Sequence, residues 1–180
     1  GCDINSVASI TISSKEASNK TTGNTYIFET ADEGNVIFDN KVVENNGEKH
    51  LSPNYEKYLE MLETIPEGYS EHDIKNVLDF LRGKILEETG YAAMHPYSVK
   101  VLEGKGIKIT LVIYNGGRLP LVLPKIPIKL VDEKKSIIIS DMIDINVSVE
   151  SGKVGVFETI VDKDNIKEFT NDLGTWEITF

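Results

Sequence analysis

The stretch that decides the fold is residues 107–140, which read "IKITLVIYNGGRLPLVLPKIPIKLVDEKKSIIIS". Its first part, residues 107–114, places isoleucine or leucine at every second position, which is the period of a β-strand with one buried face. Residues 115–117, Asn-Gly-Gly, follow at once and predict a tight turn, because both residue types tolerate the backbone angles of such turns. The sequence therefore predicts a strand that turns back on itself.

The returning segment carries prolines, which restrict how it can pair. Proline has no backbone N–H and is confined to edge strands and bulges, so we expect an edge or bulged crossing here and a regular strand only over Ile128–Val131. The prolines are Pro120, Pro124 and Pro127. Short β-rich runs continue to the last stretch, "TWEITF", with a turn at residues 151–153. Several short strands at regular spacing are typical of an antiparallel sandwich.

Two helices are predicted before this β-rich part. The first begins after Ser52, which can cap it, and ends at Pro66. The second begins at Ser70, with Asp73 three residues later in an acidic variant of the capping box, and ends at Gly90. The apolar stripe of the first helix would consist of Tyr55, Tyr58, Leu59 and Leu62.

The N-terminal part is poorer in apolar residues. Two β-rich runs, Tyr26–Glu29 and Val36–Val43, predict a hairpin. Residues 3–23 are rich in Ser, Thr, Asn and Lys, and they form either a flexible linker or a short edge strand near Ile10. We therefore expect an α+β fold, mainly an immunoglobulin-like antiparallel β-sandwich with two short helices inserted before the C-terminal strands. A single domain would cover residues 24–180.

Composition excludes several classes of function. The chain has 180 residues, a net charge of −10 and one cysteine. An acidic chain without a cluster of lysine and arginine repels phosphate backbones, so we expect no nucleic-acid partner. A single cysteine excludes an internal disulfide framework and any zinc or iron–sulfur site built from several cysteines. We expect no cofactor.

No catalytic motif stands out. His50, His72 and His95 have no second histidine or carboxylate at metal-ligand spacing, so we interpret them as surface or partly buried residues. Residues 104–106, Gly-Lys-Gly, lack the surroundings of a phosphate-binding loop and predict a tight turn. We therefore assign no catalytic and no metal-binding residue.

Two acidic residues and one tryptophan leave alternatives open. Asp162 and Asp164 have alternate spacing that could chelate calcium, although the glycine and glutamate of an EF-hand loop are missing. The simpler interpretation is that Asp164 caps a short helix over Asn165–Asn171. Trp176 alternates with Ile178 and is expected in the core, whereas an exposed Trp176 would indicate a ligand surface.

The C-terminal half resembles the SLAP domain, the S-layer-associated module of exported proteins in Gram-positive bacteria. The likeness spans roughly residues 105–180, within a β part that begins near residue 98, and includes the Asp-Leu-x-x-Trp ending. The turn "DEKKSI" and the strand "VGVFETIV" depart from the family pattern. The resemblance implies association with the cell surface or S-layer, and it brings no catalytic residues. It rests on Asn115, Leu130, Asp132, Asp172, Leu173 and Trp176.

The opening "GC" matches the processed junction of bacterial lipoproteins, in which a cysteine after a small residue carries the lipid. Cys2 is the predicted lipidation site, although Gly1 could also be a cloning scar. Residues 1–23 would be a leader and tether spanning roughly 25 Å. The protein would then be extracellular, held on the outer face of the cytoplasmic membrane only through the lipid.

Three functions follow, in order of preference. The first is a non-enzymatic surface module for interaction or structure, whose partner is a component of the cell envelope or a surface protein. The second is a lipoprotein that captures a sugar or peptide in a pocket lined by aromatics such as Tyr91, Tyr97 or Trp176. The third is a hydrolase, which would need paired carboxylates with raised pKa values converging in a cleft.

Overall fold

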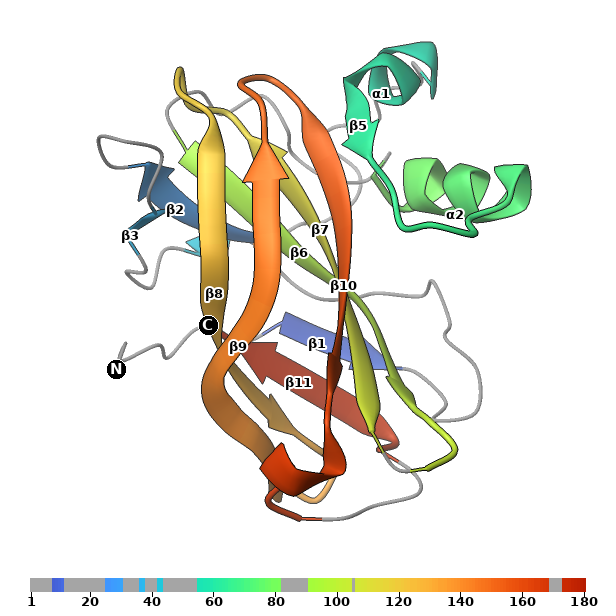
Figure 1. Ribbon diagram of the computed structural model, residues 1–180, viewed down its shortest axis with the longest axis vertical. Coiled ribbons are helices and arrows are strands. Elements are labelled where there is room, and N and C mark those ends of the chain that lie inside the picture. The colour runs from blue at the N-terminus through green and yellow to red at the C-terminus, as the bar shows by residue number, and fades with distance from the viewer. Residues whose placement is uncertain are drawn as a thin grey trace.

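The structure, a computed structural model, describes residues 8–11, 25–30, 36–37, 42–43, 55–81, 91–104, 106–168 and 173–180. The chain is mostly β, with two sheets and few helices, which confirms a β-rich α+β fold. Figure 1 shows the two helices together at one side of the strands.

The first sheet contains four strands in the order β1-β11-β8-β9. Their bounds are β1 Ala8–Thr11, β11 Thr175–Thr179, β8 Leu121–Val131 and β9 Ile137–Val149. All its pairs are antiparallel. The longest pairing joins β8 to β9, the two strands that run side by side in Figure 1.

The second sheet has the order β3-β2-β6-β7-β10-β5, and β4 also pairs with β2. The bounds are β2 Thr25–Thr30, β3 Val36–Ile37, β4 Val42–Val43, β5 Leu62–Thr64, β6 Tyr91–Val101, β7 Ile107–Asn115 and β10 Val154–Val161. Only the short pair of β5 with β10 is parallel. The three long strands β6, β7 and β10 form the centre of this sheet, and the shorter strands lie at its two edges.

One apolar core is shared by the inward faces of both sheets. Strand β7 supplies Ile107, Ile109, Leu111 and Ile113 to it, at the spacing that the sequence predicts. The last strand supplies Trp176, which is 0 % exposed, so the expectation of a core tryptophan is confirmed. Burying these large aliphatic and aromatic side chains is the main source of stability, at about 1.5 to 3 kcal/mol each.

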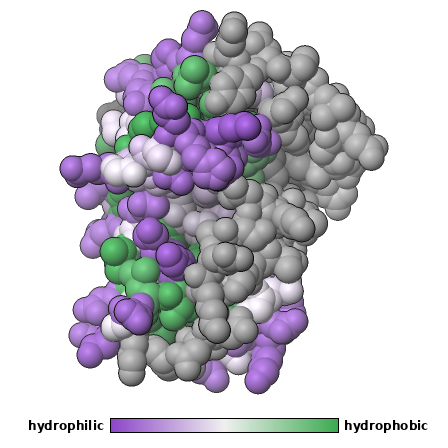
Figure 2. Space-filling view, turned by 90° about the vertical axis from the view of Figure 1, so that its right-hand side faces the viewer, coloured by the Kyte–Doolittle hydropathy of each residue, from purple (hydrophilic) through white to green (hydrophobic). Residues whose placement is uncertain are grey.

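A second apolar cluster lies on the outward face of the second sheet. Helices α1 (Tyr55–Met61) and α2 (Glu71–Leu81) pack there against Val112 and Tyr114 of β7 and against neighbouring residues of β6 and β10. Strand β7 is therefore buried on both faces at this end. Figure 2 shows the molecule from this side, where the coloured surface is largely hydrophilic with small, separate hydrophobic areas.

The first helix is shorter than the sequence predicts. We expected helix as far as Pro66, but α1 ends at Met61 and residues 62–64 form β5, which pairs with β10. Leu59 was expected on the buried stripe and is 47 % exposed, whereas Tyr58 is buried. Residues 62–64 form a strand instead of a further helical turn because β10 provides an edge with which they can pair. A helix of only two turns has little stability of its own and depends on tertiary packing.

The proline-rich return is one strand, which corrects the expectation that strand begins only at Ile128. Strand β8 starts at Leu121 and pairs with β9 along its length, with a register shift between Leu123 and Lys125. Its other side pairs with β11 only from Lys129 onward. Pro124 and Pro127 therefore lie in an edge segment with a bulge, which confirms the expected edge or bulged crossing, and Pro120 lies just before the strand.

Other expected elements are confirmed in part. Strand β2 forms the predicted hairpin, but the second run is split into β3 and β4, and both pair with β2. Near Ile10 the edge-strand alternative holds, since β1 pairs with β11. In place of a helix over Asn165–Asn171 there is a 3-10 turn at Lys163–Asn165, and Ile166 is already extended. Residues 82–90 and 169–172, with the predicted helix stop at Gly90, lie outside the described residues.

Candidate functional site

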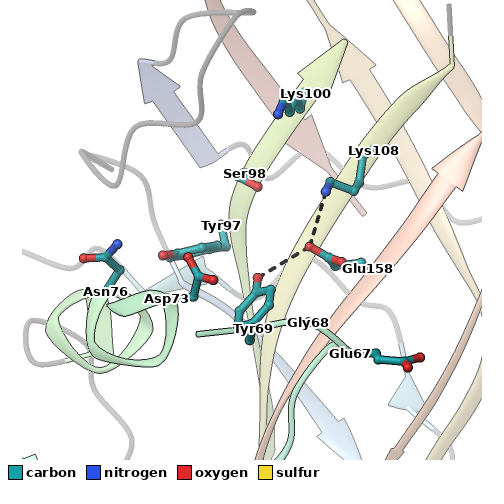
Figure 3. Close-up of a pocket in the computed structure, with 10 residues that line it drawn as sticks. All are labelled: Glu67, Gly68, Tyr69, Asp73, Asn76, Tyr97, Ser98, Lys100, Lys108 and Glu158. Carbon is teal, nitrogen blue, oxygen red and sulfur yellow. Dashed lines mark hydrogen bonds and ion pairs between the residues drawn. The ribbon is translucent and has the colours of Figure 1, made fainter. Parts of the chain in front are cut away.

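The candidate site is a pocket at the place where the helices stop covering the second sheet. Its volume is about 430 Å³, within the range usual for small-molecule sites. Figure 3 shows its wall of sheet residues facing α2 and the segment that leads into α2. The lining residues are Glu67, Gly68, Tyr69, Asp73, Asn76, Tyr97, Ser98, Lys100, Lys108 and Glu158.

A β-bulge in β6 brings two consecutive residues to this wall. Pairing with β7 runs regularly up to Pro96 and resumes at Ser98, so Tyr97 is the extra residue. Tyr97 packs under α2, with its ring 5.0 Å from that of Phe80 in an edge-on arrangement. Ser98 lines the pocket and is 7 % exposed. Bulges commonly redirect side chains near functional sites, as this one does.

Glu158 on β10 is the centre of the polar contacts. Its Oε2 atom accepts hydrogen bonds from the Tyr69 hydroxyl at 3.5 Å and from the Thr110 hydroxyl at 3.4 Å. The same oxygen lies 3.8 Å from the Lys108 ammonium, and both charged side chains are about a quarter to a third exposed. Two hydroxyl donors and one ammonium group, from the segment before α2 and from β7, therefore surround one carboxylate oxygen.

Tyr69 stays protonated over the whole physiological range. Burial raises the pKa of its phenol well above the ordinary value of 10.0, and the negative charge of nearby Glu158 raises it further. A neutral phenol is a hydrogen-bond donor, which is the role that the contact with Glu158 requires.

At one end of the pocket, two lysines face each other across neighbouring strands. Lys100 of β6 and Lys108 of β7 are directly paired in the sheet register, and both line the pocket. Figure 3 shows them on the same stretch of the wall as Ser98. Like charges directly opposite each other destabilise a sheet, so this arrangement is a feature that needs an explanation.

The opposite rim is acidic and belongs to the start of α2. Asp73 Oδ2 accepts hydrogen bonds from the backbone N–H of Ser70 at 2.9 Å and from its hydroxyl at 3.0 Å. The backbone N–H of Asp73 donates to Ser70 Oγ at 3.1 Å, which confirms the predicted capping box. These bonds lower the pKa of Asp73, whereas the acid of a hydrolase needs a raised pKa.

A second hollow of about 420 Å³ adjoins the first. Lys108 and Glu158 line both, so their ion pair forms the boundary between the two. The remaining lining residues are Asp144, Ile145, Asn146, Thr159 and Ile160, from the edge where β9 meets β10.

The predicted site residues are scattered over the molecule. Of the three candidate aromatics, Tyr97 lines the pocket and Trp176 lies in the core, while the side chain of Tyr91 is outside the described part. His95, expected at the surface or partly buried, is 1 % exposed and lies edge-on to Phe80 with ring centroids 6.0 Å apart. His72 is exposed, and His50 and Cys2 lie outside the described residues.

The two acids considered for calcium do not converge with others. Asp162 and Asp164 are both exposed beside the 3-10 turn, and the Asp162 side chain makes no capping hydrogen bond. Asp164 lies within this turn and caps no helix, which corrects that interpretation. Over residues 55–81, 91–104, 106–168 and 173–180 no group of three potential metal-ligating side chains is found.

Sequence reasoning missed the residues that make the pocket. The polar positions Lys108 and Thr110 alternate with the core isoleucines of β7, which predicts an outward direction but no neighbours. Tyr69 and Glu158 are 89 residues apart in the chain and carry no motif. Their meeting depends on how the helices pack on the sheet.

Among the helices that the structure describes, none is long and apolar enough to cross a membrane. No family model matches the chain, and neither a curated protein nor a solved structure was found to match it.

Proposed function

We propose that this chain is a non-enzymatic binding module that captures a small polar ligand in the pocket between α2 and the second sheet. The observation that carries the proposal is the pocket itself, which combines aromatic, hydroxyl, amide, cationic and anionic side chains in about 430 Å³. A few convergent polar groups beside aromatic walls are the usual make-up of a small-molecule site. The first choice among ligands is a sugar or a short peptide.

The module would be displayed at the cell surface through a lipid on Cys2, and the support for this is the "GC" junction in the sequence. Strand β1 begins at Ala8, so only residues 3–7 separate Cys2 from the first sheet. Such a tether would be much shorter than the 23-residue leader that composition alone predicts. A fully extended segment of five residues spans at most roughly 18 Å, so the domain would sit close to the bilayer.

The two sheets, which share one core, would form an immunoglobulin-like sandwich of the kind expected from the sequence. The resemblance to the SLAP domain supports an alternative, in which the module binds a component of the cell envelope or S-layer. Asn115, Leu130, Asp132, Leu173 and Trp176, five of the six residues that carry it, are buried, and none lines the pocket. These buried residues therefore support a fold in common with the SLAP domain rather than a ligand in common with it.

Ligand titration followed by NMR of the full chain tests the capture proposal. Monosaccharides and dipeptides should shift the backbone amides of Ser98, Lys100 and Lys108 in a saturable way. Asn76→Leu should abolish the shifts, because it removes a pocket amide without touching the core, and Asn165→Leu, at an exposed position outside both hollows, is the matched control. Absence of saturable shifts with every probe would contradict the proposal.

Anchoring needs a separate experiment. Expression of the precursor in a bacterium with lipoprotein processing, fed a labelled fatty acid, should label the wild-type protein and not Cys2→Ser. A wild-type protein without label would contradict the surface anchor and leave the pocket unaffected. Recovery of the chain on isolated S-layer or cell-wall fractions, undiminished by Asn76→Leu, would favour the alternative partner.

A further inference from the structure

The lysine end of the pocket carries more positive charge than the protein balances. Lys100 and Lys108 are direct cross-strand partners on the outward face, and both are only partly exposed. Within the described part of the chain, Lys108 has one ion-pair partner, Glu158 at 3.8 Å, and Lys100 has none. Of the two ammonium groups, which repel each other, only that of Lys108 therefore has a carboxylate partner in this part of the chain.

That carboxylate is also largely occupied. The Oε2 atom of Glu158 receives the hydroxyls of Tyr69 and Thr110 as well as the charge of Lys108. These contacts hold it on the β10 side of the wall, whereas Lys100 lies on β6 with β7 between them. A rotation of Glu158 towards Lys100 would give up the bonds that fix it.

Ser98 provides an independent observation. Its side chain lines the pocket on the same strand and face as Lys100, two residues earlier, although the residue is only 7 % exposed. Figure 3 shows Ser98 on this wall beside Lys100. A hydroxyl can donate a hydrogen bond, so an acceptor atom of a ligand at this place would find a donor beside the two ammonium groups.

From these observations we infer that Ser98, Lys100 and Lys108 form a subsite for an anionic group of the ligand, a carboxylate or a phosphate. The inference rests on the proposed function, since it specifies which ligands the pocket prefers. An anion between the two ammonium groups removes their repulsion and forms charge-assisted hydrogen bonds with both. The remainder of the ligand would lie towards Tyr69 and Asn76.

Matched pairs of probes test the charge alone. Galacturonic acid and galactose differ in a carboxylate, and glucose 6-phosphate and glucose differ in a phosphate. NMR titration of the full chain at low salt should give at least about tenfold tighter binding for the acid of one or both pairs, as charged hydrogen bonds require. Which acid binds tells carboxylate from phosphate.

Variants then assign the preference to the subsite. Lys100→Met and Lys108→Met keep the length of the side chain and remove its charge, so either should bring the acid down to the affinity of the neutral sugar. Lys129→Met, at an exposed lysine on β8, is the matched control and should change nothing. Added sodium chloride should weaken binding of the acid to the wild-type protein and leave the neutral sugar unaffected, a readout that needs no variant.

The outcomes separate the two proposals. Saturable binding of neutral sugars in this pocket without preference for their acids would overturn the anion subsite and leave the binding function standing. No saturable binding of any of the four probes would overturn the subsite, and the dipeptide titrations would then decide the binding function alone. A preference that survives both lysine variants would also overturn it.

Discussion

Replacing Asn115 by alanine should destabilise the protein more than any other single change to a polar side chain described above. Asn115 is 0 % exposed at the end of β7. Its Nδ2 donates to the carbonyl oxygens of Leu119 at 2.8 Å and Val149 at 2.9 Å, and its Oδ1 accepts from the backbone N–H of Gly117 at 2.9 Å. One side chain thus joins the turn after β7 to the end of β9.

The magnitude follows from what the truncation leaves behind. Two of the three bonds are buried, and a buried group that loses its partner costs about 1 to 3 kcal/mol. The third, to Leu119, is partly buried, so water can replace it at a smaller cost of about 0.5 kcal/mol. We expect a loss of about 2.5 to 6.5 kcal/mol, a large share of the about 5 to 15 kcal/mol that a domain typically has.

Urea denaturation followed by tryptophan fluorescence measures this loss. Trp176 is the only tryptophan and is fully buried, so its emission reports the opening of the core. Asn165→Ala is the matched control, because Asn165 is exposed and its variant should stay within about 0.5 kcal/mol of the wild type. If Asn115→Ala were no less stable than Asn165→Ala, the reasoning would be refuted.

A second substitution at the same position separates hydrogen bonding from packing. Asn115→Asp keeps the shape and the acceptor for Gly117, but it directs a buried negative charge at two carbonyl oxygens. It should be less stable than Asn115→Ala at pH 7 and should recover as the pH falls, since burial raises the pKa of a carboxyl group in the folded state. Stability that is independent of pH would contradict this account.

Three further changes give graded expectations. Gly155→Ala should cost about 1 to 3 kcal/mol in urea denaturation, because an added Cβ would overlap the buried ring of Phe157. Ser70→Ala should cost about 1 kcal/mol in the same assay, through loss of the cap of α2. The wild type should lose stability as the pH rises above 10.0, since the pKa of Tyr69 is higher in the folded state, and Tyr69→Phe should reduce this alkaline loss.

Each of these expectations has its own control. In a Phe157→Leu background, Gly155→Ala should cost less than in the wild type, and equal costs would show that the ring is not the obstacle. Ser140→Ala, at an exposed position on β9, should be neutral, and a cost equal to that of Ser70→Ala would contradict the role of the cap. If Tyr69→Phe lost as much stability at alkaline pH as the wild type, the loss would be due to other tyrosines.

Local pattern predicts the strands well where one face meets the core. The alternation in β7 and the turn after it are correct, because burial of every second residue depends only on the period of a strand. The prolines of β8 correctly indicate an edge or a bulge, but they do not show that the strand continues through them, because the pairing of a segment depends on its neighbours. Here β11 covers β8 only from Lys129, so strand extends through Pro124 and Pro127.

The pocket could not be predicted from local pattern. Its position is the boundary at which α2 stops covering the sheet, and this boundary is set by the packing of Phe80 on Tyr97. The predicted length of helix α1 was too great because residues 62–64 pair with the distant strand β10, which their own sequence does not indicate. Elements whose state depends on a distant partner give no signal within their own residues.

The bulge at Tyr97 has a wider consequence for how this protein can vary. Before it, the outward residues of β6 are apolar or aromatic and belong beneath α2; after it, they are Ser98 and Lys100. Deleting one residue there would invert the remainder of the strand, driving Lys100 into the core and Val99 into water. Substitutions at these outward positions leave the core unchanged, so the side chains that line the pocket can vary. The number of residues between Pro96 and Ser98 cannot vary, because a deletion there would turn core residues outward.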